Sequence, residues 1–228
     1  MSIVIAGGHG KIGLRVARLL AGQERRPVSL VRKAEHEADV IAVGAHPVRY
    51  DLESGTAQEL AEHLRGAGAV IFAAGAGPGS GVARKDTVDR AAAALLADAA
   101  EIAGVRRYLM VSAIGVDEAA EQDFGPDQDQ WAAYVKAKKA ADDDLRSRDL
   151  DWTVLRPGRL TDDSGTGEVE LGPDVSRGDV TREDVAAVLV ALLDEPRTSG
   201  LTVNLVGGST PIGEAVAALV ASGPSITS

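Results

Sequence analysis

Residues 2–22 read SIVIAGGHGKIGLRVARLLAG, and this stretch decides the fold. A short apolar run, typical of a buried strand, leads into Gly7, Gly10 and Gly13 and then into apolar residues at helical spacing. Glycines let a chain turn sharply from strand to helix, because residues without a Cβ adopt unusual backbone angles and allow close packing. The following helix offers free N–H groups and a partial positive charge to an anion. We therefore expect a strand–turn–helix unit that binds a diphosphate; the alternative is the same turn without a ligand.

The composition favours an α/β domain and argues against several kinds of partner. The chain has 228 residues, of which 45% are hydrophobic but only 3% aromatic, so Ala, Val, Leu and Ile must build the core. A net charge of −10 opposes binding to nucleic acid or to an anionic membrane. There are no cysteines and no apolar run near the roughly 18 residues of a membrane span. We expect a cytoplasmic protein with a small-molecule substrate and no metal site, either monomeric or homodimeric.

Strand-like and helix-like segments alternate along the chain, which predicts βαβ units and a parallel sheet. We expect residues 1–228 to form one domain, with a small cap over the site at residues 158–180. A short hairpin is expected within the cap, a loop at 117–129 and a helix at 85–103. A glycine-rich loop at 75–81 could move over a ligand. The expected strands are 3–6, 27–31, 47–51, 69–74, 107–113, 151–157 and 201–207.

The end of the second expected strand bears on the choice of cofactor. Dinucleotide sites that prefer NAD usually place an acid there, to bind the ribose 2′-hydroxyl. This chain has Arg32 and Lys33 instead, and two cations suit a 2′-phosphate. We therefore expect NADP(H) in preference to NAD(H), although a solvated basic pair is the alternative. In the glycine turn, Lys11 is a candidate for a phosphate contact.

The ends of the third and fourth strands supply further candidates for cofactor contacts. Asp51, followed by Leu52, could accept a hydrogen bond from adenine or could cap the next helix, and both readings stay open. The small residues Ala73, Ala74 and Gly75 would let the backbone pass close to a ribose. The candidate cofactor-binding set comprises Gly7, Gly10, Lys11, Ile12, Gly13, Arg32, Lys33, Asp51, Leu52, Ala73, Ala74, Gly75, Lys138, Pro157 and Gly158.

A second motif, YVKAK at residues 134–138, suggests acid–base chemistry. Tyr134 and Lys138 are four residues apart and would share one helix face. A nearby ammonium favours the phenolate, so we expect a lowered tyrosine pKa and a proton transfer that accompanies hydride transfer. Ser112, at the end of the fifth strand, could hydrogen-bond the substrate oxygen. The alternative is a tyrosine and a lysine on the surface of an amphipathic helix.

These motifs in this order resemble the short-chain dehydrogenase/reductase superfamily, and most closely its atypical, NmrA-like or NAD(P)H-binding branch. The resemblance rests on IAGGHGKIG at 5–13, LVRK at 30–33, YDLE at 50–53, VIFAAGAG at 70–77, LMVSAIG at 109–115, YVKAK at 134–138 and LDWTVLRPGRLTDDSGTG at 150–167. It implies a doubly wound α/β Rossmann fold with strand order 3-2-1-4-5-6-7.

The resemblance also implies roles for individual residues. It makes Ser112, Tyr134 and Lys138 the catalytic set, with Lys138 also holding the nicotinamide ribose. It places the backbone around Pro157 and Gly158 against the nicotinamide. Two features depart from the pattern of the ordinary short-chain enzymes. Asp89 lies near the position where those enzymes often carry an asparagine, and Ser112 and Tyr134 are further apart in the sequence than is usual.

We therefore expect an NADP(H)-dependent oxidoreductase that acts on a small carbonyl, alcohol or sugar-like substrate. One alternative is an NADP(H)-binding redox sensor without turnover. Others are a nucleotide-sugar epimerase or dehydratase, or a flavin or quinone reductase. In the cap, Arg159 could bind an anionic group or form a surface ion pair.

Overall fold

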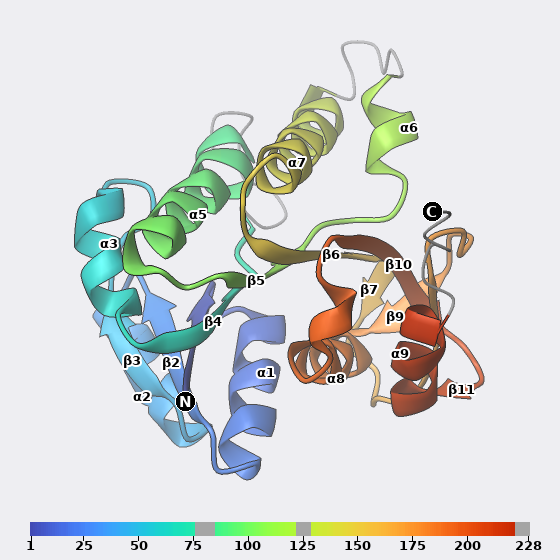
Figure 1. The fold of residues 1–228 in the computed structure, drawn as a ribbon, viewed down its shortest axis with the longest axis horizontal. Helices are drawn as coiled ribbons and strands as arrows, with labels where there is room; N and C mark the ends of the chain where they lie inside the picture. The colour runs from blue at the N-terminus through green and yellow to red at the C-terminus, as the bar shows by residue number, and fades with distance from the viewer. Residues whose placement is uncertain (76–84, 122–128, 222–228) are drawn as a thin grey trace, which may run out of the picture.

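A largely parallel β-sheet with helices on both faces forms the centre of the molecule (Figure 1). The computed structural model describes residues 1–75, 85–121 and 129–221. Within these residues the main sheet has the order β11-β8-β10-β6-β5-β4-β1-β2-β3. The parallel strands are β1 (Ser2–Ala6), β2 (Arg26–Val31), β3 (His46–Arg49), β4 (Ala67–Phe72), β5 (Arg107–Val111), β6 (Asp151–Pro157) and β10 (Leu201–Gly207). Since β10 is the seventh expected strand, the expected Rossmann order is confirmed.

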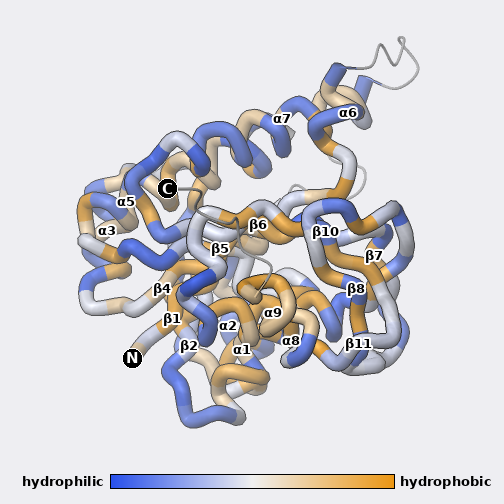
Figure 2. The backbone as a smooth tube through the Cα atoms, turned by 45° about the vertical axis from the view of Figure 1, so that its right-hand side comes forward, coloured by the Kyte–Doolittle hydropathy of each residue, from blue (hydrophilic) through white to orange (hydrophobic). Residues whose placement is uncertain are grey.

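Alternate residues of the buried strands supply two separate cores. In β1, Ile3 and Ile5 pack into the core under α1 and α8, whereas Val4 and Ala6 pack under α3 and α5. This two-sided burial explains why the central strands are continuously apolar, as the colouring of Figure 2 shows for β1 and β4. The helices are α1 (Lys11–Gly22), α2 (Glu37–Ala42), α3 (Ala57–Leu64), α5 (Ala92–Ala103), α6 (Val116–Ala120), α7 (Asp129–Arg146), α8 (Arg182–Leu193) and α9 (Ile212–Ala221).

The cap is built differently from the expected hairpin. Its first and last strands, β7 (Arg159–Thr161) and β9 (Asp179–Thr181), pair in parallel as a separate two-stranded sheet. Between them, β8 (Glu168–Gly172) leaves the cap and pairs antiparallel with β10 in the main sheet. The hairpin prediction is therefore wrong, because the middle strand finds its partner in the main sheet rather than in the cap.

Two helical segments also differ from expectation. Lys85–Ala91 is π-helical and precedes α5, so the expected helix at 85–103 is not regular throughout. The expected loop at 117–129 contains most of α6, whose Val116 and Ala119 are buried three residues apart. Asp117 and Glu118 favour its first turn because acidic groups interact well with a helix N-terminus.

The two outermost strands of the main sheet are short. Strand β3 has four residues and includes Pro47, and β11 (Thr210–Pro211) has two and ends in Pro211. β11 pairs with β8, and β3 pairs with β2. Across the parts of the chain that the structure describes, no helix combines the length and apolarity needed to cross a membrane.

Candidate cofactor and substrate site

The candidate residues lie at the carboxyl ends of the central parallel strands. The order of the sheet reverses between β1 and β4, because β2 and β3 extend to one side and β5, β6 and β10 to the other. Open α/β sheets bind ligands at such a reversal, outside the carboxyl ends of the strands. Gly7 follows β1, Ala73 follows β4, Ser112 follows β5 and Gly158 follows β6. The fold therefore brings the separate sequence motifs to one edge.

The turn between β1 and α1 has little or no room for a Cβ at Gly7, Gly8 and Gly13. Gly7 has a φ of +79°, and a Cβ there would lie 2.6 Å from Ala74 N. A Cβ on Gly13 would lie 2.4 Å from Gly7 O, which accepts a 2.8 Å hydrogen bond from Gly10 N. The N-terminus of α1 has no side-chain cap and no acidic residue in its first turn. The turn thus keeps side chains away from the helix N-terminus, as a bound diphosphate requires.

Next to this turn lies a cavity of 120 Å³ between β2, the end of β3 and the start of α5. The sequence analysis had identified Gly7, Arg32, Asp51, Leu52 and Ala74 of its lining. Other apolar and acidic residues complete the wall. Some of them lie within the motifs that carry the resemblance, but the sequence analysis assigned none of them a contact. The residues missed are Leu30, Tyr50, Glu53, Val88 and Ala92.

Both cations at the end of β2 have carboxylate partners. Arg32 Nη1 donates a 2.8 Å hydrogen bond to Glu53 Oε2, and Lys33 Nζ donates a 3.0 Å bond to Glu35 Oε1. The hydrogen bond from Lys33 holds the pKa of Glu35 below its usual value. Glu53 also accepts a 2.8 Å hydrogen bond from Thr87 Oγ1. An acid therefore does lie beside Arg32, although it comes from the segment after β3.

Asp51 does not cap the following helix, so that reading is wrong. Thr56 is the N-cap of α3: its side chain accepts a hydrogen bond from Glu59 N, and Glu59 bonds back to Thr56 N. Asp51 Oδ1 instead accepts a 3.0 Å bond from Glu53 N, and Asp51 lines the small cavity. The capping box forms between residues three apart in the sequence, so Thr56 rather than Asp51 caps the N-terminus of α3.

Lys11 connects the glycine turn to the cap. Its ammonium lies 2.5 Å from Asp162 Oδ2, and Arg182 Nη1 donates a 2.9 Å hydrogen bond to the other oxygen of Asp162. The hydrogen bond from Lys11 lowers the pKa of Asp162. Ile12, by contrast, is buried in the core beneath α1, so only its backbone N–H can take part in anion binding.

Lys138 is buried in the interior of the site. Its Nζ donates a 3.1 Å hydrogen bond to Val111 O and lies 3.3 Å from Asp89 Oδ1. Both side chains are nearly inaccessible, at 6% and 1% exposure. The Asp89 that departs from the family pattern is thus the partner of the candidate lysine. A buried ion pair of this kind fixes the position of both groups, because removing one would leave an unpaired buried charge.

Tyr134 lies on the same helix but has the opposite pKa shift to the one expected. Burial raises the pKa of its phenol above the usual 10.0, and Lys138 opposes the shift without overcoming it. The expectation of a lowered pKa is wrong because desolvation of the phenolate outweighs the effect of the ammonium. The tyrosine is therefore a neutral proton donor at ordinary pH. Its ring packs 5.4 Å from that of Trp131.

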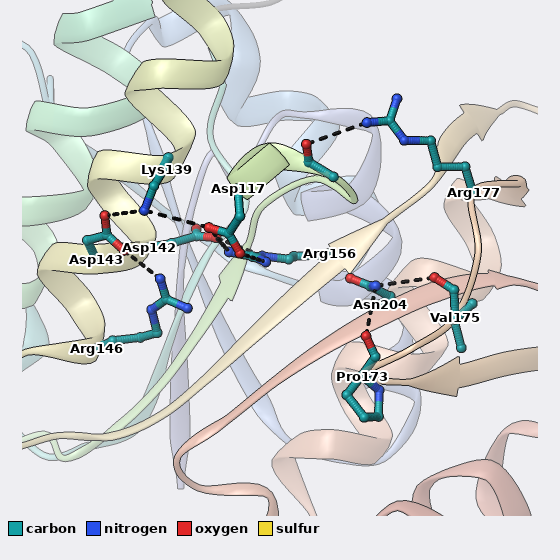
Figure 3. A network of polar contacts seen from close by, with 11 residues as sticks. Asp117, Lys139, Asp142, Asp143, Arg146, Arg156, Pro173, Val175, Arg177 and Asn204 are labelled. Carbon is teal, nitrogen blue, oxygen red and sulfur yellow. Dashed lines mark hydrogen bonds and ion pairs between the residues drawn. The ribbon is translucent and has the colours of Figure 1, made fainter. Parts of the chain in front are cut away.

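Ser112 directly follows β5 and lies close to Asp142, which belongs to a buried charge network. The serine is 5% exposed, and no partner within normal hydrogen-bond geometry is found for its hydroxyl among the described residues. In the network, Arg156 Nε donates a 2.9 Å hydrogen bond to Asp142, and Arg156 Nη1 donates a 2.6 Å bond to Asp117 (Figure 3). Burial raises the pKa of Asp142, while Arg156, the nearby Ser112 hydroxyl and Lys138 act to lower it.

A larger cavity of 710 Å³ opens between α7, the end of β6 and the cap. Tyr134, Pro157 and Gly158 contribute to its wall, as the sequence analysis expected for the reactive end of the site. Gly158 is required because a Cβ there would lie 2.1 Å from Gly178 O. Residues that the sequence analysis did not connect with this cavity are Ala113, Ile114, Trp131, Leu160, Arg177, Gly178, Asp179 and Arg182.

These features define a Rossmann-fold protein with a dinucleotide site at the carboxyl edge of its sheet. The chain belongs to the NAD(P)H-binding family, whose match covers residues 7–196. It is therefore an NAD(P)-binding protein of an oxidoreductase- and epimerase-like family.

Three relatives illustrate this similarity. A protein of Bacillus subtilis described as "uncharacterized sugar epimerase YhfK" is 36% identical over 95% of this chain and 99% of its own. A Bacillus halodurans structure, described as a candidate NAD-dependent epimerase/dehydratase, has 32% identity and a TM-score of 0.87, covering 96% of this chain and all of its own. ChuY, an anaerobilin reductase from Escherichia coli O157:H7, has 25% identity and a TM-score of 0.76, covering 91% and 97%.

Proposed function

We propose that this protein is an NADP(H)-dependent oxidoreductase of the short-chain dehydrogenase/reductase type, acting on a small carbonyl, alcohol or sugar-like substrate. The observation that supports this most strongly is the 710 Å³ cavity, which has Tyr134 and the Pro157–Gly158 backbone in its wall. The same edge of the sheet carries the Ser112 hydroxyl and the buried Lys138. An acid, an oxygen-binding hydroxyl and a cation are thus combined at one edge.

Each of these groups has a separate part in a carbonyl reduction. When bound, the nicotinamide supplies the hydride. Tyr134 stays protonated at neutral pH because burial raises its pKa, so it donates a proton to the carbonyl oxygen. The hydroxyl of Ser112 donates a hydrogen bond to the same oxygen as negative charge develops there. Lys138 opposes the rise in the pKa of Tyr134 and helps the phenol to release its proton.

The cofactor contacts follow from the glycine turn and the small cavity. The backbone N–H groups at the start of α1, from Lys11 to Gly13, would hold the diphosphate. Asp51 and Leu52 would contact the adenine end, and residues 73–75 the ribose near the nicotinamide. Arg32 and Lys33 would bind the 2′-phosphate of NADP(H), which supports NADP(H) over NAD(H).

Replacement of Tyr134 by phenylalanine tests the proposal. We expect kcat for NADPH-dependent carbonyl reduction to fall by roughly 10²- to 10⁴-fold, the usual contribution of a positioned acid. The Kd for NADPH should change little, because Tyr134 is proposed to contact the substrate oxygen and is not one of the proposed cofactor contacts. Tyr108→Phe is the matched control: that hydroxyl is buried in the core and donates to Ala93 O, 3.1 Å away.

The results separate the candidate functions. Full activity in the phenylalanine variant would remove Tyr134 from the mechanism. A wild-type protein that binds NADPH yet reduces no member of a broad carbonyl and quinone panel would be a redox sensor instead.

The descriptions of the first two relatives support a second candidate, a sugar epimerase or dehydratase. Such a reaction uses the cofactor without net consumption, whereas a reductase oxidises one NADPH for each product. Incubation of nucleotide sugars with substoichiometric cofactor, followed by NMR, distinguishes the two. Conversion of sugar in excess of cofactor would support the epimerase or dehydratase.

A further inference from the structure

The wall of the larger cavity is basic, although the chain as a whole is acidic. Among the described residues, the side chains lining it include Arg159, Arg177 and Arg182, but only one carboxylate, Asp179. The chain carries a net charge of −10. A cationic wall in an acidic protein favours anionic ligands, because the local field attracts them and repels cations.

Two of the three arginines have carboxylate partners within the protein. Arg159 pairs with Asp179 through two hydrogen bonds, one of them 2.8 Å from Nε to Oδ1. Arg182 pairs with Asp162, which also binds Lys11. Arg159 therefore forms a surface ion pair, which was one of the two expectations for this residue. Neither of these guanidinium groups can bind a ligand without the loss of an ion pair.

Arg177 is different, because no carboxylate among the described residues pairs with it. Its Nη2 makes one long hydrogen bond, 3.5 Å to Gly115 O, at the start of α6 (Figure 3). The guanidinium lies so close to the turn that a Cβ on Gly115 would come within 2.2 Å of Arg177 Nη2, although the φ of +75° is what requires glycine at this position. The remaining N–H donors of a guanidinium form a planar fork that suits a carboxylate or a phosphate.

The loop that carries Arg177 is held in place from the main sheet. Asn204, on β10, donates hydrogen bonds of 3.1 Å to Pro173 O and 3.2 Å to Val175 O (Figure 3). On the other side of Arg177, Gly178 O accepts a 2.9 Å bond from Arg159 N. The loop backbone is thus fixed on both sides of the arginine. A group positioned in this way loses little conformational freedom when it binds a ligand.

The wall of the same cavity also contains an aromatic pair. The rings of Trp131 and Tyr134 lie 5.4 Å apart, and Trp131 is 47% exposed. An exposed indole in a cavity wall offers a flat apolar surface to a ring or a planar group of a ligand. The cavity therefore combines one free cation among the described residues, a flat apolar surface and the candidate proton donor.

From this arrangement we propose that the substrate is an anionic carbonyl or alcohol compound, bound by Arg177 through a carboxylate or phosphate group and by Trp131 through a planar or apolar part. This inference rests on the proposed function for the reaction at Tyr134, and adds the chemical class of the substrate. Arg177 is a binding residue, so it affects recognition of the anion rather than proton transfer.

Three aromatic aldehydes of similar size test the charge requirement. They are para-carboxybenzaldehyde, its methyl ester and para-formylphenyl phosphate, each reduced with NADPH. We expect the KM of one anionic aldehyde to be at least about tenfold below that of the ester, since a hydrogen bond to a charged group is worth this much or more. The anion with the lower KM identifies the preferred group. Similar KM values for all three aldehydes would overturn the inference.

The variant Arg177→Gln tests the residue. It should raise the KM of the preferred anionic aldehyde toward that of the ester, and it should change the KM of the ester much less. The matched control is Arg65→Gln, which removes an exposed arginine paired with Glu62 at the end of α3. Equal losses in the two variants, or an equal effect of Arg177→Gln on the ester, would contradict a specific contact.

Calorimetry separates this inference from the proposed function. NADPH is titrated first, followed by para-hydroxymethylbenzoate, para-hydroxymethylphenyl phosphate and the neutral methyl ester. If an anionic probe binds more tightly than the ester and loses this advantage in Arg177→Gln, the anion site is confirmed even without turnover. If NADPH binds and the anionic probes show no advantage, the anion site is wrong and the cofactor proposal survives.

Discussion

At the scale of single residues, Glu53 would limit the strength with which Arg32 binds a 2′-phosphate in the proposed NADP(H) site. Its carboxylate holds the guanidinium in a 2.8 Å ion pair, with 43% of the Arg32 side chain exposed. Glu53→Gln should remove this competition and tighten NADPH roughly two- to fivefold, in line with the small worth of exposed pairs. NADH should change little, and calorimetric titration of both cofactors measures the difference. Glu62→Gln, on α3, is the control; an equal gain for NADH would exclude the role.

The same residues show how far sequence can predict a site. Gly7, Gly13 and Gly158 were predictable because their role depends on the local course of the backbone. Glu53 and Arg177 were not, because each meets its partner only after distant segments come together. The pKa of Tyr134 was predicted in the wrong direction for a similar reason. A spacing of four residues indicates the nearby ammonium but not the burial that outweighs it.

At the scale of elements, the contact between the end of β6 and the loop before β9 depends on the absence of a Cβ atom at Gly158. Gly158→Ala would place a Cβ 2.1 Å from the backbone oxygen of Gly178, which cannot rotate away. We expect a loss of about 1 to 3 kcal/mol in the free energy of unfolding, as for other overpacked sites. Chemical denaturation measures it. In the control, Gly213→Ala on α9, the Cβ meets no atom within 4 Å, so stability should stay equal or rise.

The elements themselves were predictable to different degrees. The seven parallel strands were found because continuous apolar runs between helices are a strong local signal. β8 and β11 were missed as members of the sheet, since β11 is only two residues long and β8 lies in a turn-rich segment. The π-helical segment and α6 flank the parts of the chain outside the described residues, which include the glycine-rich loop at 76–81.

At the scale of the whole molecule, ion pairs make the fold sensitive to acid. Seven carboxylates in ion pairs have pKa values below their usual 3.8 or 4.5, so these seven favour the folded state when ionised. The stabilisation is complete at a pH above the pKa values that these carboxylates have in the unfolded chain. It is lost as the pH falls through the lower pKa values that they have in the folded protein. Asp142 acts in the opposite direction, because its pKa is raised. The lowered set comprises Glu35, Asp86, Asp117, Asp143, Asp149, Asp162 and Glu195.

We therefore expect the thermal unfolding midpoint to fall by several degrees as the pH is lowered from about 5 to about 3, where carboxylates normally titrate. Differential scanning calorimetry at fixed ionic strength measures the change. Added salt should reduce the dependence, because most of these pairs are exposed and therefore screened. A midpoint that stays constant or rises toward pH 3 would show that the pairs do not stabilise the fold.

The short outer strands of the main sheet also restrict how copies of the protein can associate. A strand at an open edge recruits another chain through its unpaired N–H and C=O groups. Here β3 is four residues long and contains Pro47, and β11 is two residues long and contains Pro211, so each margin lacks an amide donor. A continuous sheet shared between subunits is therefore disfavoured at both margins. Self-association, where it occurs, would have to use helical faces, and these margins would protect the protein against amyloid-like stacking.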